Sequence, residues 1–137
     1  MKILVTGASG FIGFHLCKKL LQNNYEVIGI DNFNSYYDTS LKEDRFKELK
    51  KISSKKYFQI YREDIKNFSS LDKIFRNSQP DIVVNLAAQA GVRYSIENPS
   101  EYVQTNLVGF ANILECCRIQ NVKHFVYASS SSVYGGN

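Results

Sequence analysis

The sequence has 137 residues, of which 44% are hydrophobic and 22% charged, and a formal net charge of +4. This length predicts one domain with one hydrophobic core, and the sequence shows no membrane-spanning run and no Cys-x-x-Cys or Cys/His cluster for a metal. Much of the basic charge lies at residues 42–56, mixed with acidic residues, which is typical of a solvated helix face rather than of a nucleic-acid site.

The chain begins with a strand, a glycine turn and a helix. An apolar run predicts a strand over residues 2–5, and apolar residues at helical spacing predict a helix over 11–21. The glycines between them let the backbone turn sharply and a phosphate come close, and the helix N-terminus offers free N–H groups and partial positive charge. The sequence therefore predicts a site for a dinucleotide pyrophosphate. Its residues are Gly7, Gly10, Phe11, Ile12 and Gly13, with the spacing G-x-x-G-x-x-G.

An acidic residue follows the second predicted strand. This strand covers residues 25–30, and Asp31 stands at its C-terminal end, about twenty residues beyond the glycines. A carboxylate there accepts hydrogen bonds from both hydroxyls of an adenosine ribose and repels a 2′-phosphate. Because Asn32 and Phe33 supply no cation to offset that repulsion, the sequence predicts NAD rather than NADP. The alternative is that Asp31 only begins a loop, as an Asp-Asn pair often does.

Strand and helix patterns alternate through the rest of the chain. A tyrosine-rich loop over 32–40 precedes a helix over about 41–52, a strand over 57–61 and a helix over 70–77 capped by Ser69 or Ser70. A buried strand over 82–86 follows, then a long amphipathic helix with apolar residues at 103, 107, 110, 114 and 117, and a strand over 123–128. This alternation and the glycine turn predict a doubly wound α/β fold of the Rossmann type with a parallel sheet in the order 3-2-1-4-5.

The carboxyl ends of the strands are where such sheets bind their ligands. The residues after the third strand are expected to hold the adenine, and the small residues after the fourth let a ribose and pyrophosphate lie against the backbone. The serines at 129–132 follow the fifth strand and are expected to face a substrate, with a flexible loop as the alternative. The cofactor-binding residues predicted from the strand ends are Asp31, Asn32, Asp64, Ile65, Leu86, Ala87 and Ala88.

These stretches together resemble the extended short-chain dehydrogenase/reductase superfamily, and within it the NAD-dependent nucleotide-sugar epimerases. The resemblance covers essentially the whole chain. The residues that carry it lie at 6–13, 64–65, 86–88 and 129–135. Residues 31–38 and 88–95 resemble UDP-glucuronate 4-epimerases and are more specific than the fold signature. Asn85 departs from the pattern, because many relatives carry His there.

The resemblance implies a redox-neutral reaction on a UDP-sugar. In this family a tyrosine removes the 4-OH proton while hydride passes to NAD⁺, and the 4-keto sugar takes the hydride back on its other face. Ser130 matches the family residue that hydrogen-bonds the 4-oxygen, with Ser129 as the fallback, and Ser131 is expected beside the substrate. Arg93 is a candidate to bind a sugar carboxylate or phosphate, with a surface arginine as an equal alternative. Asn106 matches an asparagine that organises the cofactor site, unless it serves only local structure.

The family's catalytic base and its partner form the motif Tyr-x-x-x-Lys, and no tyrosine of this chain has a lysine four residues later. We therefore expect residues 1–137 to be an incomplete NAD-binding Rossmann domain, the N-terminal part of a longer epimerase, inactive by itself. Buried thiols at Cys17, Cys116 and Cys117 would suit a reducing cytoplasm. The complete enzyme is expected to be a cytoplasmic homodimer that binds a UDP-sugar, and neither nucleic acid nor a membrane.

Three other possibilities stay open. One is a non-catalytic, NAD-binding regulatory module. Another is a structural domain that binds no NAD. The third is a nucleotide-sugar dehydratase or decarboxylase of the same superfamily. A dehydratase would need an Asp-Glu pair beside the serine position, where Ser131 and Ser132 stand.

Overall fold

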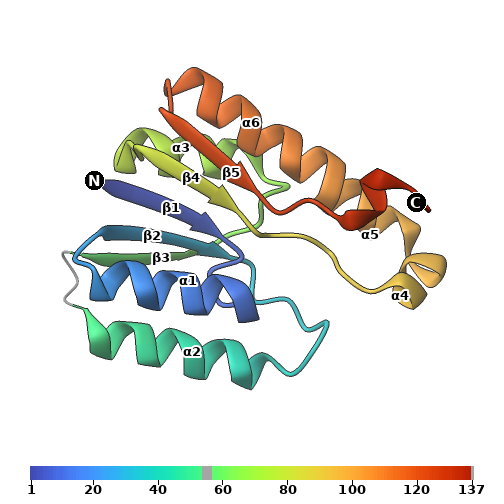
Figure 1. The fold of residues 1–137 in the computed structure, drawn as a ribbon, viewed down its shortest axis with the longest axis horizontal. Coiled ribbons are helices and arrows are strands. Elements are labelled where there is room, and N and C mark those ends of the chain that lie inside the picture. The colour runs from blue at the N-terminus through green and yellow to red at the C-terminus, as the bar shows by residue number, and fades with distance from the viewer. Residues whose placement is uncertain (54–56, 137) are drawn as a thin grey trace.

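In a computed structural model, which describes residues 1–53 and 57–136, the chain is built around one five-stranded sheet (Figure 1). All neighbouring strands are parallel, and their order is β3-β2-β1-β4-β5. The strands are β1 (Lys2–Thr6), β2 (Glu26–Asp31), β3 (Phe58–Arg62), β4 (Ile82–Asn85) and β5 (His124–Tyr127). The predicted doubly wound fold and its strand order are confirmed.

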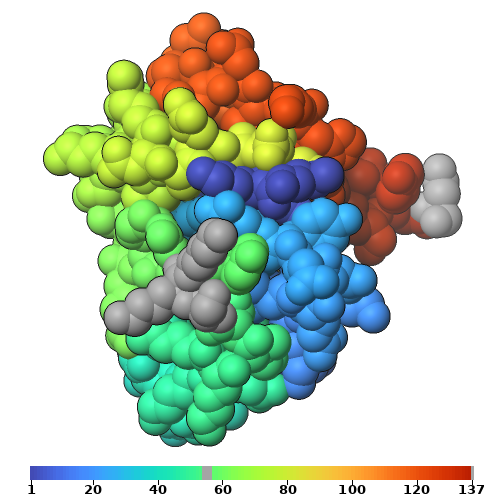
Figure 2. Space-filling model, turned by 90° about the vertical axis from the view of Figure 1, so that its left-hand side faces the viewer, coloured from blue at the N-terminus to red at the C-terminus, as the bar shows by residue number. Residues whose placement is uncertain are grey.

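Helices cover both faces of the sheet (Figure 1). One layer holds α1 (Phe11–Gln22) and α2 (Thr39–Ile52), and the other holds α3 (Phe68–Ser78) and α6 (Phe110–Ile119). The remaining elements are α4 (Val92–Glu97), α5 (Pro99–Tyr102), the π-helix η1 (Val103–Gly109) and the 3-10 helix η2 (Ser131–Tyr134). From the end at which the strands begin, the dark blue start of β1 lies between the orange and yellow C-terminal half and the blue and green N-terminal layers (Figure 2).

The central strand β1 contributes side chains to two separate cores, one under each helix layer. Ile3 and Val5 pack with residues of α1 and α2, and Leu4 packs with residues of α3 and α6. None of the three is more than 5% exposed. Alternate residues of a strand point to opposite faces, so a strand covered on both faces needs apolar residues at every position. Burial of this surface, at roughly 25 cal/mol per Å², is the main force that holds the helices on the sheet.

Two helices start earlier than predicted, because aspartate and asparagine residues cap them. α2 begins at Thr39, where the Asp38 carboxylate accepts a hydrogen bond of 2.8 Å from the Ser40 N–H. This bond lowers the pKa of the Asp38 carboxyl. α3 begins at Phe68, and the Asn67 side chain accepts from the Ser70 N–H at 3.3 Å. A cap accepts from the N–H groups two or three residues later, so Ser70 is the partner and the predicted serine cap is wrong.

The long helix predicted near the C-terminus is not regular, and its predicted buried face is partly wrong. η1 closes wider, π-type turns before α6 begins, which changes the faces on which side chains project relative to a period of 3.6 residues. Val103, Leu107 and Leu114 of the predicted stripe are between 42% and 65% exposed. The buried residues of this region are Gly109, Ile113, Cys116 and Cys117.

The three cysteines are free, buried thiols, as predicted. Cys17 lies in α1, and burial together with the nearby negative charge of Asp31 raises its pKa to about 12. Burial, with a smaller effect of nearby acidic groups, raises the pKa of Cys116 to about 12, and burial raises that of Cys117 to about 11. In residues 1–53 and 57–136, no helix combines the length and the apolar character needed to cross a bilayer.

These raised pKa values predict that the native protein resists alkylation. The thiolate is the nucleophilic form, and all three groups stay protonated at about pH 8, where an ordinary cysteine is partly ionised. We expect no adducts after brief treatment of the native protein with iodoacetamide, and adducts on all three cysteines in denaturant, as measured by intact mass. Rapid labelling of the native protein would contradict this result.

Candidate functional site

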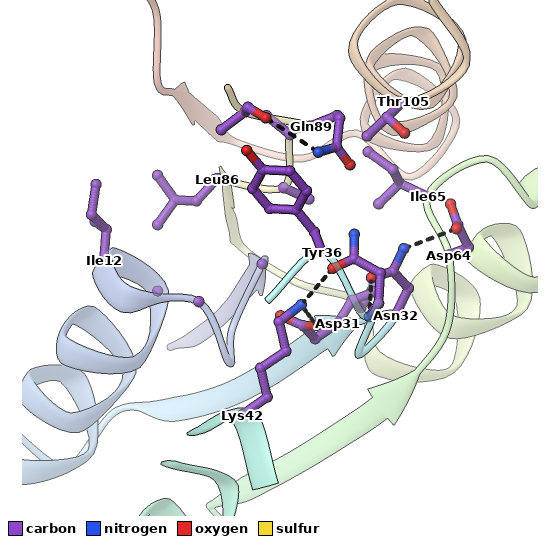
Figure 3. A pocket seen from close by; sticks show the side chains of 18 of the residues that line it. Ile12, Asp31, Asn32, Tyr36, Lys42, Asp64, Ile65, Leu86, Gln89 and Thr105 are labelled. Atoms are coloured by element: carbon purple, nitrogen blue, oxygen red, sulfur yellow. Dashed lines mark hydrogen bonds and ion pairs between the residues drawn. The ribbon is translucent and has the colours of Figure 1, made fainter. Parts of the chain in front are cut away.

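A cavity of about 350 Å³ lies at the carboxyl ends of the strands (Figure 3). The glycine turn after β1, the end of β2 and the segments after β3 and β4 all contribute to its wall. The residues predicted to bind a cofactor that line it are Gly7, Gly10, Phe11, Ile12, Gly13, Asp31, Asn32, Asp64, Ile65, Leu86, Ala87 and Ala88. The fold thus brings together residues that lie up to 81 positions apart in the sequence, from Gly7 to Ala88.

The glycine turn packs closely against its neighbours. Gly7 adopts a φ of +69°, and a Cβ there would lie 3.0 Å from the backbone of Leu86 and Ala87. A Cβ on Gly13 would lie 2.0 Å from the Gly7 carbonyl oxygen. The helix-capping position is Gly10, which has no side chain, so the first N–H groups of α1 keep their capacity for an anion. The turn is therefore a tight cradle that added side chains would fill.

A buried threonine joins the glycine turn to the segment after β4. The Thr6 hydroxyl donates to the Asn85 side-chain oxygen at 2.6 Å and accepts from the Leu86 and Ala87 N–H groups at 3.1 Å each. Thr6 is fully buried and Asn85 is 6% exposed. Asn85 therefore orients the hydroxyl that fixes this wall of the cavity.

Asn106 does not line the cavity but holds one of its walls. Its side-chain oxygen accepts from the Gln89 N–H at 2.8 Å, and its side-chain nitrogen donates to the Gln89 carbonyl at 3.0 Å. An asparagine can satisfy both backbone groups of one residue in this way. Both Thr105, which lines the cavity, and Asn106 belong to the π-helix η1. Sequence reasoning missed Thr105 as a cavity residue, because it lies on a helix rather than at the end of a strand.

Residues at the ends of β2 and β3 form a small polar network. The Asn32 side-chain nitrogen donates to the Asp64 carboxylate at 3.0 Å (Figure 3). The same carboxylate accepts from the Lys66 N–H at 2.9 Å, which holds it at the start of the segment after β3. Ile65 is 4% exposed and belongs to the core beneath α3 and α6, so its visible surface gives this end of the cavity an apolar wall.

Asp31 is buried and forms an ion pair that the sequence analysis did not predict. Its carboxylate accepts from the Ser9 N–H at 3.0 Å and the Phe33 N–H at 2.8 Å. The Lys42 ammonium lies 3.2 Å from it and is itself buried, with 5% of the residue exposed. Two predictions are corrected by this pair: Lys42 does not lie on a solvated face, and a cation does stand beside Asp31. The physical reason is the turn into α2, which brings the first turns of that helix back beside the end of β2 (Figure 3).

Tyrosines join the loop after β2 to the helices α4 and α5. The rings of Tyr36 and Tyr94 lie 5.2 Å apart, and those of Tyr94 and Tyr102 lie 6.2 Å apart. The Tyr102 hydroxyl donates to the Ala90 carbonyl at 2.8 Å. Gly91 has a φ of +101°, and a Cβ on it would lie 2.1 Å from the Tyr36 hydroxyl oxygen. The sequence predicted a tyrosine-rich loop over 32–40 but no contacts for it, and the partners of Tyr36 come from a distant segment.

Three predicted substrate residues lie outside the wall of the cavity. Arg93 is an exposed residue of α4. Ser130 and Ser131 are exposed as well, at the start of η2, and the Ser130 hydroxyl oxygen accepts from the Ser132 N–H at 3.2 Å. The residue of this segment that lines the cavity is Ala128, at the end of β5. The roles of Arg93, Ser130 and Ser131 therefore stay predictions.

Comparison with known proteins places this site in a family. The family model described as GDP-mannose 4,6 dehydratase matches residues 4–137. The chain belongs to this family. Protein CapI of Staphylococcus aureus is 56% identical over the whole chain, which covers 40% of that relative. A UDP-glucuronate 4-epimerase of Thermodesulfobacterium geofontis is 47% identical over 97% of the chain and 40% of the relative.

Solved structures of this group share the fold. A point mutant of the UDP-glucuronic acid 4-epimerase of Bacillus cereus, crystallised with NAD and UDP-4-deoxy-4-fluoro-glucuronic acid, is 42% identical with a TM-score of 0.86. The match covers 100% of this chain and 42% of that one. The UDP-glucose 4-epimerase of Thermus thermophilus, in complex with NAD, is 33% identical with a TM-score of 0.78, over 95% of this chain and 38% of that one. The resemblance to nucleotide-sugar epimerases predicted from the motifs is confirmed, and the chain spans about two fifths of these relatives.

The close contact at Gly13 makes a stability prediction. Gly13→Ala should destabilise the protein by about 1–3 kcal/mol, the usual cost of overpacking, although alanine is the better helix former. The reason is that the new Cβ would displace the Gly7 carbonyl from its place under α1. The measurement is urea-induced unfolding followed by circular dichroism.

The matched control is Gly136→Ala, since no atom of the described residues beyond its chain neighbours lies within 4 Å of a Cβ at that position. We expect this variant to unfold like the unchanged protein. Equal stability of Gly13→Ala and Gly136→Ala would contradict the account of the glycine turn.

Proposed function

We propose that the chain binds NAD in the cavity at the carboxyl ends of the strands. The observation that carries the proposal is the convergence of the cradle, the buried acidic residue and the small residues after β4 on one cavity. The N-terminus of α1 would hold the pyrophosphate, Asp31 the adenosine ribose, and Ile65 a face of the adenine. Relatives of this fold crystallised with NAD support the assignment.

For the whole protein we propose a nucleotide-sugar 4-epimerase that acts on UDP-glucuronate. Bound NAD would supply the acceptor for a transient oxidation at the sugar C4. Relatives named UDP-glucuronate 4-epimerase, between 44% and 48% identical, support this substrate over other UDP-sugars. A dehydratase is less well supported, because Ser131 and Ser132 stand where its Asp-Glu pair would be expected.

Within this proposal the chain's own residues bind and orient rather than transfer the proton. Ser130 would hydrogen-bond the sugar 4-oxygen, and Arg93 would bind the sugar carboxylate or a phosphate. Both side chains are exposed. The general base of the reaction would come from outside residues 1–137, since no Tyr-x-x-x-Lys lies among them. The active protein would also form a homodimer in the cytoplasm, as proposed for the whole enzyme.

Removal of the Asp31 carboxylate tests the cofactor site. Asp31→Ala should weaken NAD binding about tenfold or more, because hydrogen bonds to a charged group contribute about 1.5–3 kcal/mol. It should also narrow the difference in affinity between NAD and NADP. Isothermal titration with each dinucleotide measures both effects.

Asp44→Ala is the control, because Asp44 is an acidic residue of α2 whose side chain is 74% exposed. It should bind NAD like the unchanged protein. Unaltered NAD affinity in Asp31→Ala would refute the proposed role of the carboxylate.

A turnover assay tests the wider proposal. Residues 1–137, given NAD⁺ and UDP-glucuronate, should form no UDP-galacturonate, whereas the whole natural protein should interconvert the two sugars, as measured by chromatography. Product formed by residues 1–137 alone would contradict the proposal that the base lies elsewhere. A whole protein that binds NAD without turnover would favour the regulatory module instead.

A further inference from the structure

The buried ion pair between Lys42 and Asp31 is placed at the cavity wall rather than in a core. Both residues line the cavity, and their side chains are only 6% and 4% exposed (Figure 3). Burial of two charges costs free energy that their mutual attraction often does not recover, and apolar residues would stabilise the same space as well or better. An ion pair retained at the wall of a binding cavity therefore points to a role toward the ligand.

The hydrogen-bonding capacity of the pair is only partly used. Asp31 accepts from two backbone N–H groups and from Lys42, while a carboxylate has about four acceptor sites. The Lys42 ammonium has three donors and contacts Asp31 and the Asn34 side-chain oxygen, each at 3.2 Å. Each partner can therefore form one more hydrogen bond. The negative charge of Asp31 is also compensated before any ligand arrives.

The nearby charges add to this compensation. Arg45 donates to the Ser9 carbonyl at 3.1 Å and to the Tyr37 hydroxyl at 3.3 Å. No carboxylate in residues 1–53 and 57–136 forms a salt bridge with Arg45. The guanidinium of Arg62 is instead bound by both oxygens of Glu43, at 2.6 and 2.7 Å. Arg45 is thus a second cation near Asp31, although it does not line the cavity, whereas the Asp64 carboxylate lines the cavity and accepts from Asn32.

We propose that Lys42 determines cofactor selectivity: it weakens the repulsion that Asp31 exerts on a 2′-phosphate, and it binds that phosphate once Asp31 is neutralised. The inference rests on the proposed binding of a dinucleotide in this cavity. It differs from the sequence prediction, in which the carboxylate alone sets the preference for NAD. In the folded protein the preference comes from a pair of opposite charges, of which Asp31 restrains Lys42.

A purely structural role makes a different prediction. If Lys42 only joined α2 to the end of β2, its replacement would weaken the binding of NAD and NADP by the same factor. A role toward the 2′-phosphate instead changes the ratio of the two affinities. That ratio is the quantity to measure.

A double-mutant cycle on the two residues separates these roles. Isothermal titration with NAD and with NADP is carried out on the unchanged protein, Lys42→Met, Asp31→Asn and the double variant. Asp31→Asn should raise the NADP-to-NAD affinity ratio about tenfold or more, and Lys42→Met should lower it several-fold. In the Lys42→Met background, Asp31→Asn should raise the NADP-to-NAD affinity ratio much less. An equal gain in both backgrounds would overturn the proposal, as would equal weakening of both dinucleotides by Lys42→Met.

Two controls keep the result interpretable. Lys47→Met removes a lysine of the same helix whose side chain is 68% exposed, and it should leave the ratio unchanged. Lys42→Arg keeps the charge and should keep most of the ratio. If the unchanged protein binds neither dinucleotide, the proposed function fails as well; if it binds NAD and the ratio does not respond, only the inference about Lys42 fails.

A second test uses only the unchanged protein, so it does not depend on whether any variant folds. Adenosine 2′,5′-bisphosphate and adenosine 5′-monophosphate differ only by the 2′-phosphate. The ratio of their affinities therefore reports on the surroundings of that phosphate. Compensation of Asp31 predicts that their affinities lie within about tenfold of each other. A preference for the monophosphate of a thousandfold or more would show an uncompensated carboxylate and would overturn the proposal.

Discussion

The contact between α1 and the glycine turn is the constraint on which the rest of the cavity depends. A Cβ on Gly13 would lie 2.0 Å from the Gly7 carbonyl oxygen, so the helix can approach the turn only if that position has no side chain. The same turn lies against the backbone of Leu86 and Ala87, which Thr6 fixes by two hydrogen bonds. The carboxyl ends of β1 and β4 are thereby held together, and the free N–H groups of α1 face the space between them.

Buried polar groups set the shape of the remaining walls. Asn106 satisfies both backbone groups of Gln89, and Asp31 accepts from the Ser9 N–H of the glycine turn and from the Phe33 N–H after β2. Each contact replaces hydrogen bonds to water that these loops would otherwise need, so a wall that opened would expose unpaired groups. The loops around the cavity are thus ordered by specific hydrogen bonds, whereas the helices behind them are held by apolar burial.

Membership of the GDP-mannose 4,6 dehydratase family and the geometry of the site support different parts of the proposed function. The family includes relatives with different named reactions, so the family alone does not select a substrate. The cavity contains the features expected for a dinucleotide, but the candidate substrate residues Arg93, Ser130 and Ser131 lie outside its wall. The cofactor half of the proposal therefore rests on geometry in this chain, and the sugar half rests on similarity to epimerases and on residues beyond those described.

The sequence by itself determined the strand order, the doubly wound fold and the cavity-lining residues at the ends of the first four strands, because these follow from local signals: apolar periodicity, a glycine spacing and an acid at a fixed distance. It did not determine the partner of Asp31, because Lys42 is eleven positions away in a run of charges that looks solvent-exposed. Nor did it determine the buried face beyond Val103, because a π-helix changes the period on which that prediction relied. Only the tertiary structure decided these points: Lys42 reaches Asp31 because α2 folds back beside β2, and the π-turns alter a helical period that the sequence pattern assumes to be regular.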